Sequence, residues 1–428
     1  MNTKYITVND NAQLLYVHTE KFKTSALRMS VALPLSKDNF ILSRLLCGMM
    51  GRGTKAYPSL ELLNKRLDEL YASSVSINSS ILENLIILNI SADMLDKRFI
   101  PDNTDVLGEV LDVISEMLFA PLLVNEAFCK DKLTHEKRLL RDSYMAKIND
   151  PRAYAAIRAE ELRRRGDDGF VSLDYVINHT EEMSAKSLGI YYRNFLTYAP
   201  WHITYVGSES EERIAERLCR IFNGIHASNS AVFTQWTGCG RAHVDFVENM
   251  PINQSRLVLG FCPSEDIDGR TADALTVMNT LFGGTASSKL FLNVREKLGL
   301  CYSCGSSFSS ITRYLKVSSG ISAKNKDVAE AEILHQLNNI QNGEVSDAEM
   351  TAVRKYIEFT FDQTYDSPFA LISFYSAKEH VGDVKTPEER KADLLSVTKD
   401  DVVNASKLLV PDSRYFLCGT LGEDGGDE

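Results

Sequence analysis

A forty-residue segment of this chain recurs once, and the repeat constrains the fold more than any other sequence feature. Residues 53–92 align without a gap with residues 284–323, 231 positions later, and nine of the forty pairs are identical. Ordinary residue usage would give about two or three identities by chance. The identical pairs include Gly53 with Gly284 and Tyr71 with Tyr302. The sequence therefore predicts two copies of one fold, and it predicts function where the copies differ.

The same order of elements is predicted in each copy. An amphipathic helix follows each Gly-Thr, and a β-hairpin with one buried face follows each helix, over residues 71–91 and 302–322. Longer helical patterns come next, and each half closes with a strand that ends in Gly plus a hydroxyl residue. We therefore predict an α+β protein with two homologous halves, residues 1–226 and 231–428. Each half is expected to be an antiparallel sheet covered by helices, and the halves are expected to face each other across a cleft.

Charge and composition argue against several functional classes. The 428 residues carry a formal net charge of −11, which lacks the basic footprint of a nucleic-acid binder. No stretch approaches the roughly 20 apolar residues of a membrane span, and the N-terminus lacks the apolar core of a signal peptide, so we expect a cytoplasmic protein. The eight scattered cysteines suit reduced thiols better than a disulfide framework. The one C-x-x-C pair, Cys301 and Cys304, has no second ligand pair for zinc and lies in a predicted strand, which disfavours a metal or redox role.

The segment from Arg295 to Tyr302 carries the pattern R-x-x-x-G-L-x-Y. This pattern resembles the signature of the insulinase/pitrilysin-like zinc peptidases, the inverzincins, and especially their short-chain branch with mitochondrial processing peptidase. The resemblance covers nearly the whole chain, because residues 53–54, 149–151, the strand ending at Gly207 and residues 345–350 lie where family members have like features.

The zinc motif of the catalytic members is absent from this chain. In those members, H-x-x-E-H lies on a helix shortly before the first Gly-Thr, where two histidines at i and i+4 bind one zinc ion and the Glu activates water. The two His positions fall here on Arg44 and Gly48, and the Glu position falls on Cys47. The third ligand, a Glu farther along, falls on Ser143. None of these four residues can take the role of its counterpart, so we expect no cofactor in this chain.

The sequence leaves one alternative metal site, built from other residues close to Glu136. Glu136 matches a second family Glu that lies seven positions before the third ligand, and His135 and Cys129 are close to it in sequence. Adjacent residues and residues seven apart point to different faces of a helix, however, which disfavours a shared metal ion.

The resemblance assigns a role to Arg295 and Tyr302, which occur together in one copy only. In catalytic members the matching residues approach the scissile peptide from the half opposite the zinc. A guanidinium and a phenol are suitable donors to the oxyanion of a tetrahedral intermediate. The alternative is that Arg295 is a solvated helix residue and that Tyr302 packs its ring in a strand.

Two glycines precede this pair. Gly283 and Gly284 lie where the non-zinc subunit of mitochondrial processing peptidase has its glycine-rich loop, although the loop is shorter here. Glycines would let the backbone approach a bound peptide. The alternative is a turn and helix start, capped by Ser287 or Ser288.

Two hypotheses of function follow. The favoured one is a zinc-less subunit of a two-chain metallopeptidase that acts on unfolded peptides. This chain would be inactive alone, and it would contribute the substrate and oxyanion contacts of Arg295 and Tyr302 and half of a chamber that encloses the peptide. Zinc is then expected in the partner, an insulinase-like subunit with H-x-x-E-H that forms a heterodimer with this chain; a homodimer stays open. The rival is a catalytically inactive structural or peptide-binding homologue that acts as an assembly scaffold. The rival explains the missing zinc residues equally well, but it gives no reason for Arg295 and Tyr302 to keep the family spacing.

Overall fold

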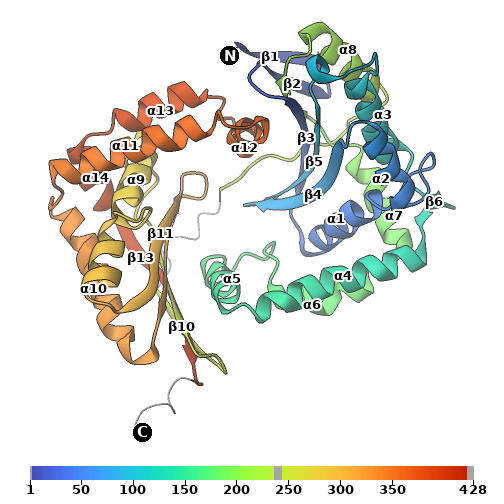
Figure 1. Ribbon diagram of the computed structural model, residues 1–428. Helices are drawn as coiled ribbons and strands as arrows, with labels where there is room; N and C mark the ends of the chain where they lie inside the picture. Colours follow the sequence, from blue (N-terminus) through green and yellow to red (C-terminus); the bar gives the residue numbers. More distant parts are fainter. Residues whose placement is uncertain (1, 236–242, 422–428) are drawn as a thin grey trace. The chain divides into compact units, whose positions relative to one another are not determined.

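The computed structural model describes residues 2–235 and 243–421 and separates into two compact units (Figure 1). Unit 1 comprises Met1–Tyr144, Val171–Thr234 and Gln363–Val384, and unit 2 comprises Met145–Phe170, Gln235–Asp362 and Lys385–Glu428. Each unit is built around one sheet. Within the described residues, no helix is both long and apolar enough to cross a membrane.

The sheet of unit 1 has six strands. Their order is β1 (Asn2–Asn9), β2 (Ala12–His18), β8 (Trp201–Gly207), β3 (Thr24–Pro34), β5 (Leu85–Leu95) and β4 (Ser74–Leu82). Neighbouring strands are antiparallel except β2 and β8, which are parallel. A separate two-stranded ribbon consists of β6 (Leu123–Val124) and β7 (Ala127–Phe128).

The sheet of unit 2 has five strands and the same topology. Their order is β11 (Cys301–Ser309), β12 (Tyr314–Ile321), β10 (Ser255–Pro263), β13 (Leu409–Gly419) and β9 (Val244–Met250). Only β13 and β9 are parallel, which matches the place of the β8–β2 pair in unit 1. The predicted α+β fold with two homologous halves is confirmed. The expectation of purely antiparallel sheets is wrong at one pair in each sheet. Those strands are far apart in sequence, so no hairpin turn joins them and no local signal marks the pairing.

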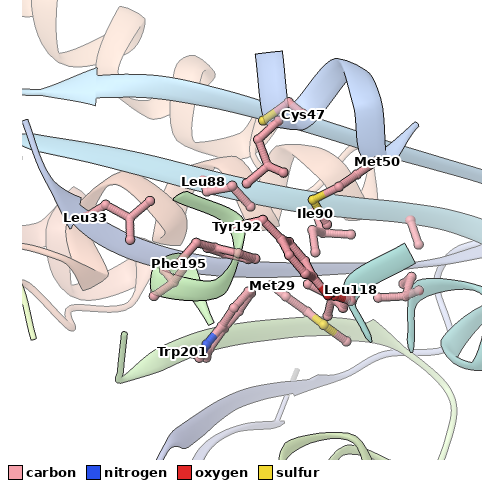
Figure 2. Packing of buried hydrophobic residues seen from close by; sticks show 14 of the residues in the cluster. Met29, Leu33, Cys47, Met50, Leu88, Ile90, Leu118, Tyr192, Phe195 and Trp201 are labelled. Atoms are coloured by element: carbon pink, nitrogen blue, oxygen red, sulfur yellow. The ribbon is translucent and has the colours of Figure 1, made fainter. Parts of the chain in front are cut away.

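Helices cover one face of each sheet and form the main cores. Those of unit 1 are α1 (Lys37–Met50), α2 (Leu60–Glu69), α3 (Val106–Phe119), α4 (Lys130–Ile148), α6 (Leu173–His179), α7 (Ala185–Phe195) and α8 (Glu211–Phe222). Figure 2 shows the packing of this core, in which Met29 of β3 and Ile90 of β5 meet Leu118 of α3 and Phe195 of α7. In unit 2 the corresponding helices are α9 (Gly269–Phe282), the π-helix η3 (Leu290–Lys297), α10 (Lys326–Gln341), α11 (Asp347–Gln363), α13 (Pro387–Leu395) and α14 (Lys399–Ser406).

One further helix packs on the opposite face of each sheet, and in sequence it comes from the other half. In unit 1, Leu371 and Tyr375 of α12 (Pro368–Glu379) cluster with Val206 of β8. In unit 2, Ala155 of α5 (Pro151–Arg163) clusters with Val258 of β10. The compact units therefore exchange two segments relative to the predicted halves, residues 1–226 and 231–428. Those boundaries, and a cleft between the halves, stay predictions.

Candidate functional site

The positions that correspond to the zinc motif lie on α1. The helix begins after Ser36, whose hydroxyl accepts a hydrogen bond from the Asn39 amide at 3.2 Å. Gly48 lies where α1 contacts α4: a Cβ atom built at Gly48 would be 2.2 Å from Oε2 of Glu136. Only glycine leaves room for that carboxylate, so a histidine at this position would displace it.

Glu136 is held in place by an arginine. Its side chain is buried, and its Oε1 accepts a hydrogen bond from Nε of Arg52 at 2.5 Å. The carboxylate therefore lies over Gly48 on one side and pairs with a permanent cation on the other. Glu136 therefore fills the space beside Gly48, and Arg52 neutralises the negative charge that a metal ion would need.

Cys47 cannot serve as a general base. Figure 2 shows its side chain among the buried residues of the unit 1 core. Burial raises the pKa of the thiol to about 12, although a hydrogen bond with Ser79 acts in the opposite direction. At neutral pH the sulfur is therefore a protonated thiol, which is a poor base and a poor metal ligand.

The two remaining positions also have structural roles. The guanidinium of Arg44 lies 5.2 Å from the centre of the Phe40 ring and hydrogen-bonds with Tyr144. Ser143 is exposed, and its hydroxyl donates to the Leu140 carbonyl of its own helix at 2.6 Å. Both side chains therefore already have partners within the protein.

The other metal site considered from sequence is not assembled either. Among the described residues, no group of three or more His, Cys, Asp or Glu side chains could hold a metal ion. His135 is exposed on α4, and Glu136 points to Arg52. Cys129, His135 and Glu136 therefore do not form the constellation that the sequence left open.

Arg295 and Tyr302 lie on consecutive elements of unit 2. Arg295 is in the last turn of η3, and Gly299, with φ of 60°, ends the helix by donating its amide to the Arg295 carbonyl at 3.1 Å. Arg295 is half-exposed, with its guanidinium 4.7 Å from the Phe291 ring centre and 3.5 Å from the Glu296 carboxylate. Wider π-turns of this kind are often found at functional sites.

Tyr302 lies at a β-bulge. The pairing of β11 with β12 goes from Cys301 opposite Ile321 to Ser303 opposite Gly320, so Tyr302 is the extra residue. Its side chain is 75% exposed, and therefore the alternative of a ring packed in the strand is wrong. A bulge re-aims a side chain away from the regular alternation of a strand. The aligned Tyr71 lies instead in the turn after α2, with φ of 58°, so the matched tyrosines differ in local structure.

Gly283 and Gly284 lie in a tight turn after α9. Both amides donate to the Asn279 carbonyl, and a Cβ atom on Gly283 would be 2.6 Å from the Ser306 amide nitrogen of β11. The missing side chain of Gly283 is thus used for packing of the helix end against the strand, which is what the turn interpretation expects. A role in peptide binding stays a prediction for both glycines.

The bulge also brings Cys301 and Cys304 into contact, which the sequence could not reveal. A hydrogen bond with Cys304 lowers the pKa of Cys301 below the usual range of a thiol, and the charge of Arg295 acts in the same direction. The Arg295 side chain therefore acts on the first residue of β11, next to Tyr302.

Comparisons with known proteins agree with this picture. Residues 182–357 match the family described as peptidase M16 inactive domain. The chain is 28% identical over 407 residues to the probable inactive metalloprotease YmfF of Bacillus subtilis, covering 95% of each protein. The crystal structure of a conserved protein from Enterococcus faecalis V583 superposes with a TM-score of 0.88 at 25% identity, covering 99% of this chain and 100% of that chain.

A more distant structure shares the fold. The peptidase M16 inactive domain from Pseudomonas fluorescens superposes with a TM-score of 0.79 at 16% identity, covering 98% of this chain and 99% of that chain. The resemblance stated from the sequence is confirmed: this chain is similar to M16, or insulinase-like, peptidases that are described as inactive, it lacks the zinc motif of the catalytic members, and its residues 182–357 match the peptidase M16 inactive domain.

Proposed function

We propose that this chain is a non-catalytic peptidase homologue that binds unfolded peptide segments. The observation that carries the proposal is the Glu136–Arg52 ion pair over Gly48, because the Glu136 carboxylate lies where a side chain at position 48, one of the expected zinc-ligand positions, would be. The edge strand β11 offers a surface for a peptide, since β12 is the one strand that pairs with it in the described sheet and most of its residues are at least partly exposed. On its other edge, the Ser306 amide donates to the Gly283 carbonyl at 2.9 Å. Edge strands bind extended peptides through main-chain hydrogen bonds.

Zinc and peptide measurements test this proposal. After dialysis against micromolar zinc, elemental analysis is expected to find no stoichiometric metal, and the protein is expected to bind a labelled unfolded peptide without cleaving it. One zinc ion per chain, together with hydrolysis that a chelator stops, would contradict the proposal.

A second candidate is that the chain completes the active site of a zinc-bearing partner. The observation in its favour is the exposure of Tyr302 at the bulge, next to Arg295. In such a heterodimer the partner's zinc would generate the nucleophile, and this chain would donate hydrogen bonds to the developing oxyanion. A homodimer would leave those donors without a metal to face.

Hydrolysis of a quenched fluorescent peptide by the mixed chains separates the two candidates. Tyr302→Phe and Arg295→Ala are expected to reduce turnover by about 10² each if the donors act on an oxyanion. Tyr356→Phe and Arg354→Ala remove the same groups from exposed positions of α11 and serve as matched controls. Formation of the complex is checked by size-exclusion chromatography. Full activity of the double variant Arg295→Ala/Tyr302→Phe rejects the second candidate and leaves the first in place.

A further inference from the structure

A cationic cavity of about 390 Å³ lies in unit 2, beside the edge strand β11. Its lining contains three cationic side chains, Arg152, Arg256 and Lys316, and serines of β11 and β12. None of the described residues that line it is acidic. The contrast with the net charge of −11 shows that positive charge is locally concentrated here.

The cavity lies on the sheet face that α5 partly covers. Val258 of β10 packs against Ala155 and Ala159 of α5, and Arg256 follows on the same face because strand side chains alternate. Arg256 of β10 lies opposite Gly320 of β12 in the sheet. A Cβ atom built on Gly320 would be 2.4 Å from Nη1 of Arg256 and 3.1 Å from the hydroxyl of Ser303 on β11. Glycine at 320 therefore lets the guanidinium lie across β12 to β11.

The cations of this cavity lack counter-ions. In the described part of the chain, Nε of Arg256 is buried without a hydrogen-bond partner, and no ion pair involves Arg152, Arg256 or Lys316. The carboxylate whose charge acts on Arg256 is that of Asp150, which caps α5 by accepting from the Arg152 and Ala153 amides. Burial lowers the pKa of Arg256, and the charge of Arg152 acts in the same direction, whereas Asp150 opposes them. Such unpaired, partly buried cations are stabilised by a bound anion.

We propose that this cavity binds the side-chain carboxylates of an acidic peptide that lies along β11. The proposal rests on the peptide-binding function above and names the substrate class. An extended peptide beside β11 would place every second side chain on the cavity's face. The Ser306 amide already donates to the Gly283 carbonyl at 2.9 Å, so the peptide's main chain would pair with the other outward-facing groups of β11. A volume of about 390 Å³ is in the range of small-ligand sites. A free oxyanion such as phosphate shares this chemistry but has no use for the adjoining strand edge.

Fluorescence anisotropy with two labelled peptides of the same length tests the proposal. One is unfolded and has Glu at alternate positions, and the other has Gln in their place. The full-length protein is expected to bind the Glu peptide about tenfold more tightly, and the difference is expected to shrink as salt is raised. Arg256→Gln and Lys316→Gln should each remove most of that preference for the Glu peptide over the Gln peptide. Lys355→Gln, which removes an equal charge from an exposed position of α11, should leave that preference unchanged.

The outcomes separate this inference from the proposed function. If both peptides bind equally well, peptide binding stands and the carboxylate site is rejected; if neither binds, both are rejected. Inorganic phosphate at low millimolar concentration is a further arm. Phosphate that binds in a Lys316-dependent manner, without any preference for the Glu peptide, would assign the cavity to a free oxyanion and overturn the proposal. Thermal melting of each variant identifies losses caused by unfolding, and Lys316→Gln alone suffices if Arg256→Gln does not fold.

Discussion

Gly48, at a position expected to hold a zinc-binding histidine in the catalytic members, leaves space that another side chain fills. The family motif needs a histidine here, but the space above Gly48 is taken by Glu136 and its partner Arg52. In the resemblance stated from the sequence, Arg44, Cys47 and Ser143 lie where two ligands and the base would be, whereas Gly48 also leaves room for a contact with Glu136. The sequence predicted the loss of function at these positions; it could not predict the ion pair, because α1 and α4 are far apart in sequence.

Because Gly48 contacts Glu136, we predict that, in a double-mutant cycle, Gly48→Ala lowers the free energy of unfolding when Glu136 is present and raises it when Glu136 is replaced by alanine. Gly48→Ala should cost about 1–3 kcal/mol in the wild-type background, because the new methyl group displaces the Glu136 carboxylate from Arg52. In a Glu136→Ala background the same change should stabilise by up to about 1 kcal/mol, because alanine is the better helix former. Urea titration gives the free energies of unfolding.

Gly51 is the matched control for that cycle. It ends the same helix with a helical φ of −73°, and a Cβ atom there would make only ordinary contacts, at 3.6 Å. Gly51→Ala should therefore have the same small effect in both backgrounds. If Gly48→Ala changes the free energy of unfolding by the same amount with and without Glu136, the carboxylate moves aside freely and the prediction is wrong.

At the scale of elements, the link from η3 to β11 sets the positions of Arg295 and Tyr302. The helix ends at a left-handed glycine, Gly299, and the strand starts with the bulge at Tyr302. The sequence predicted a helix followed by a hairpin strand at these places. It did not predict the π-helical turn or the bulge, since both depend on hydrogen bonds with neighbouring elements rather than on residue pattern.

Gly299→Ala should affect this link specifically. Gly299 and Gly343 both follow helices with positive φ, 60° and 82°, and a Cβ atom on either would meet no atom within 4 Å. Alanine at either position should therefore cost a similar amount, about 1 kcal/mol, through backbone strain alone. Only Gly299→Ala is expected to speed amide hydrogen exchange at residues 298–304 and to weaken peptide binding. Identical exchange and binding in the two variants would mean that the helix end does not position Tyr302.

The sheet topology and the cationic cavity could also be predicted from the sequence only in part. The repeat, the hairpins and most helices follow from periodicity, so the two-copy α+β fold could be predicted. The parallel pairs β2–β8 and β9–β13 and the convergence of Arg152, Arg256 and Lys316 could not, because each joins residues from distant segments. Because side chains alternate between the two faces of a strand, the sequence could place Arg256 on one face of β10 and Lys316 on one face of β12. It could not place α5 beside that face.

At the scale of the whole molecule, the exchanged helices link the two halves of the chain. α5 belongs to the first half in sequence but covers Val258, Tyr415 and Leu417 of the unit 2 sheet. α12 belongs to the second half but covers Leu15, Val17 and Val206 of the unit 1 sheet. Each half alone would therefore leave an apolar sheet face open to water, which is unfavourable by roughly 25 cal/mol for each Å² exposed.

Separate expression of the halves tests this interdependence. Residues 1–226 and 231–428, produced as two chains, are each expected to bind a hydrophobic dye and to melt without a cooperative transition, because the exposed sheet faces favour loose or aggregated states. Mixing or co-expressing them should restore a cooperative melt, since α5 and α12 can then pack on their sheets. As a control, residues 1–226 carrying substitutions of Ala155 and Ala159 by Asp should fold no worse alone, but should fail to rescue the second half. A first half that melts cooperatively by itself and binds no dye would show that α12 is dispensable for its sheet.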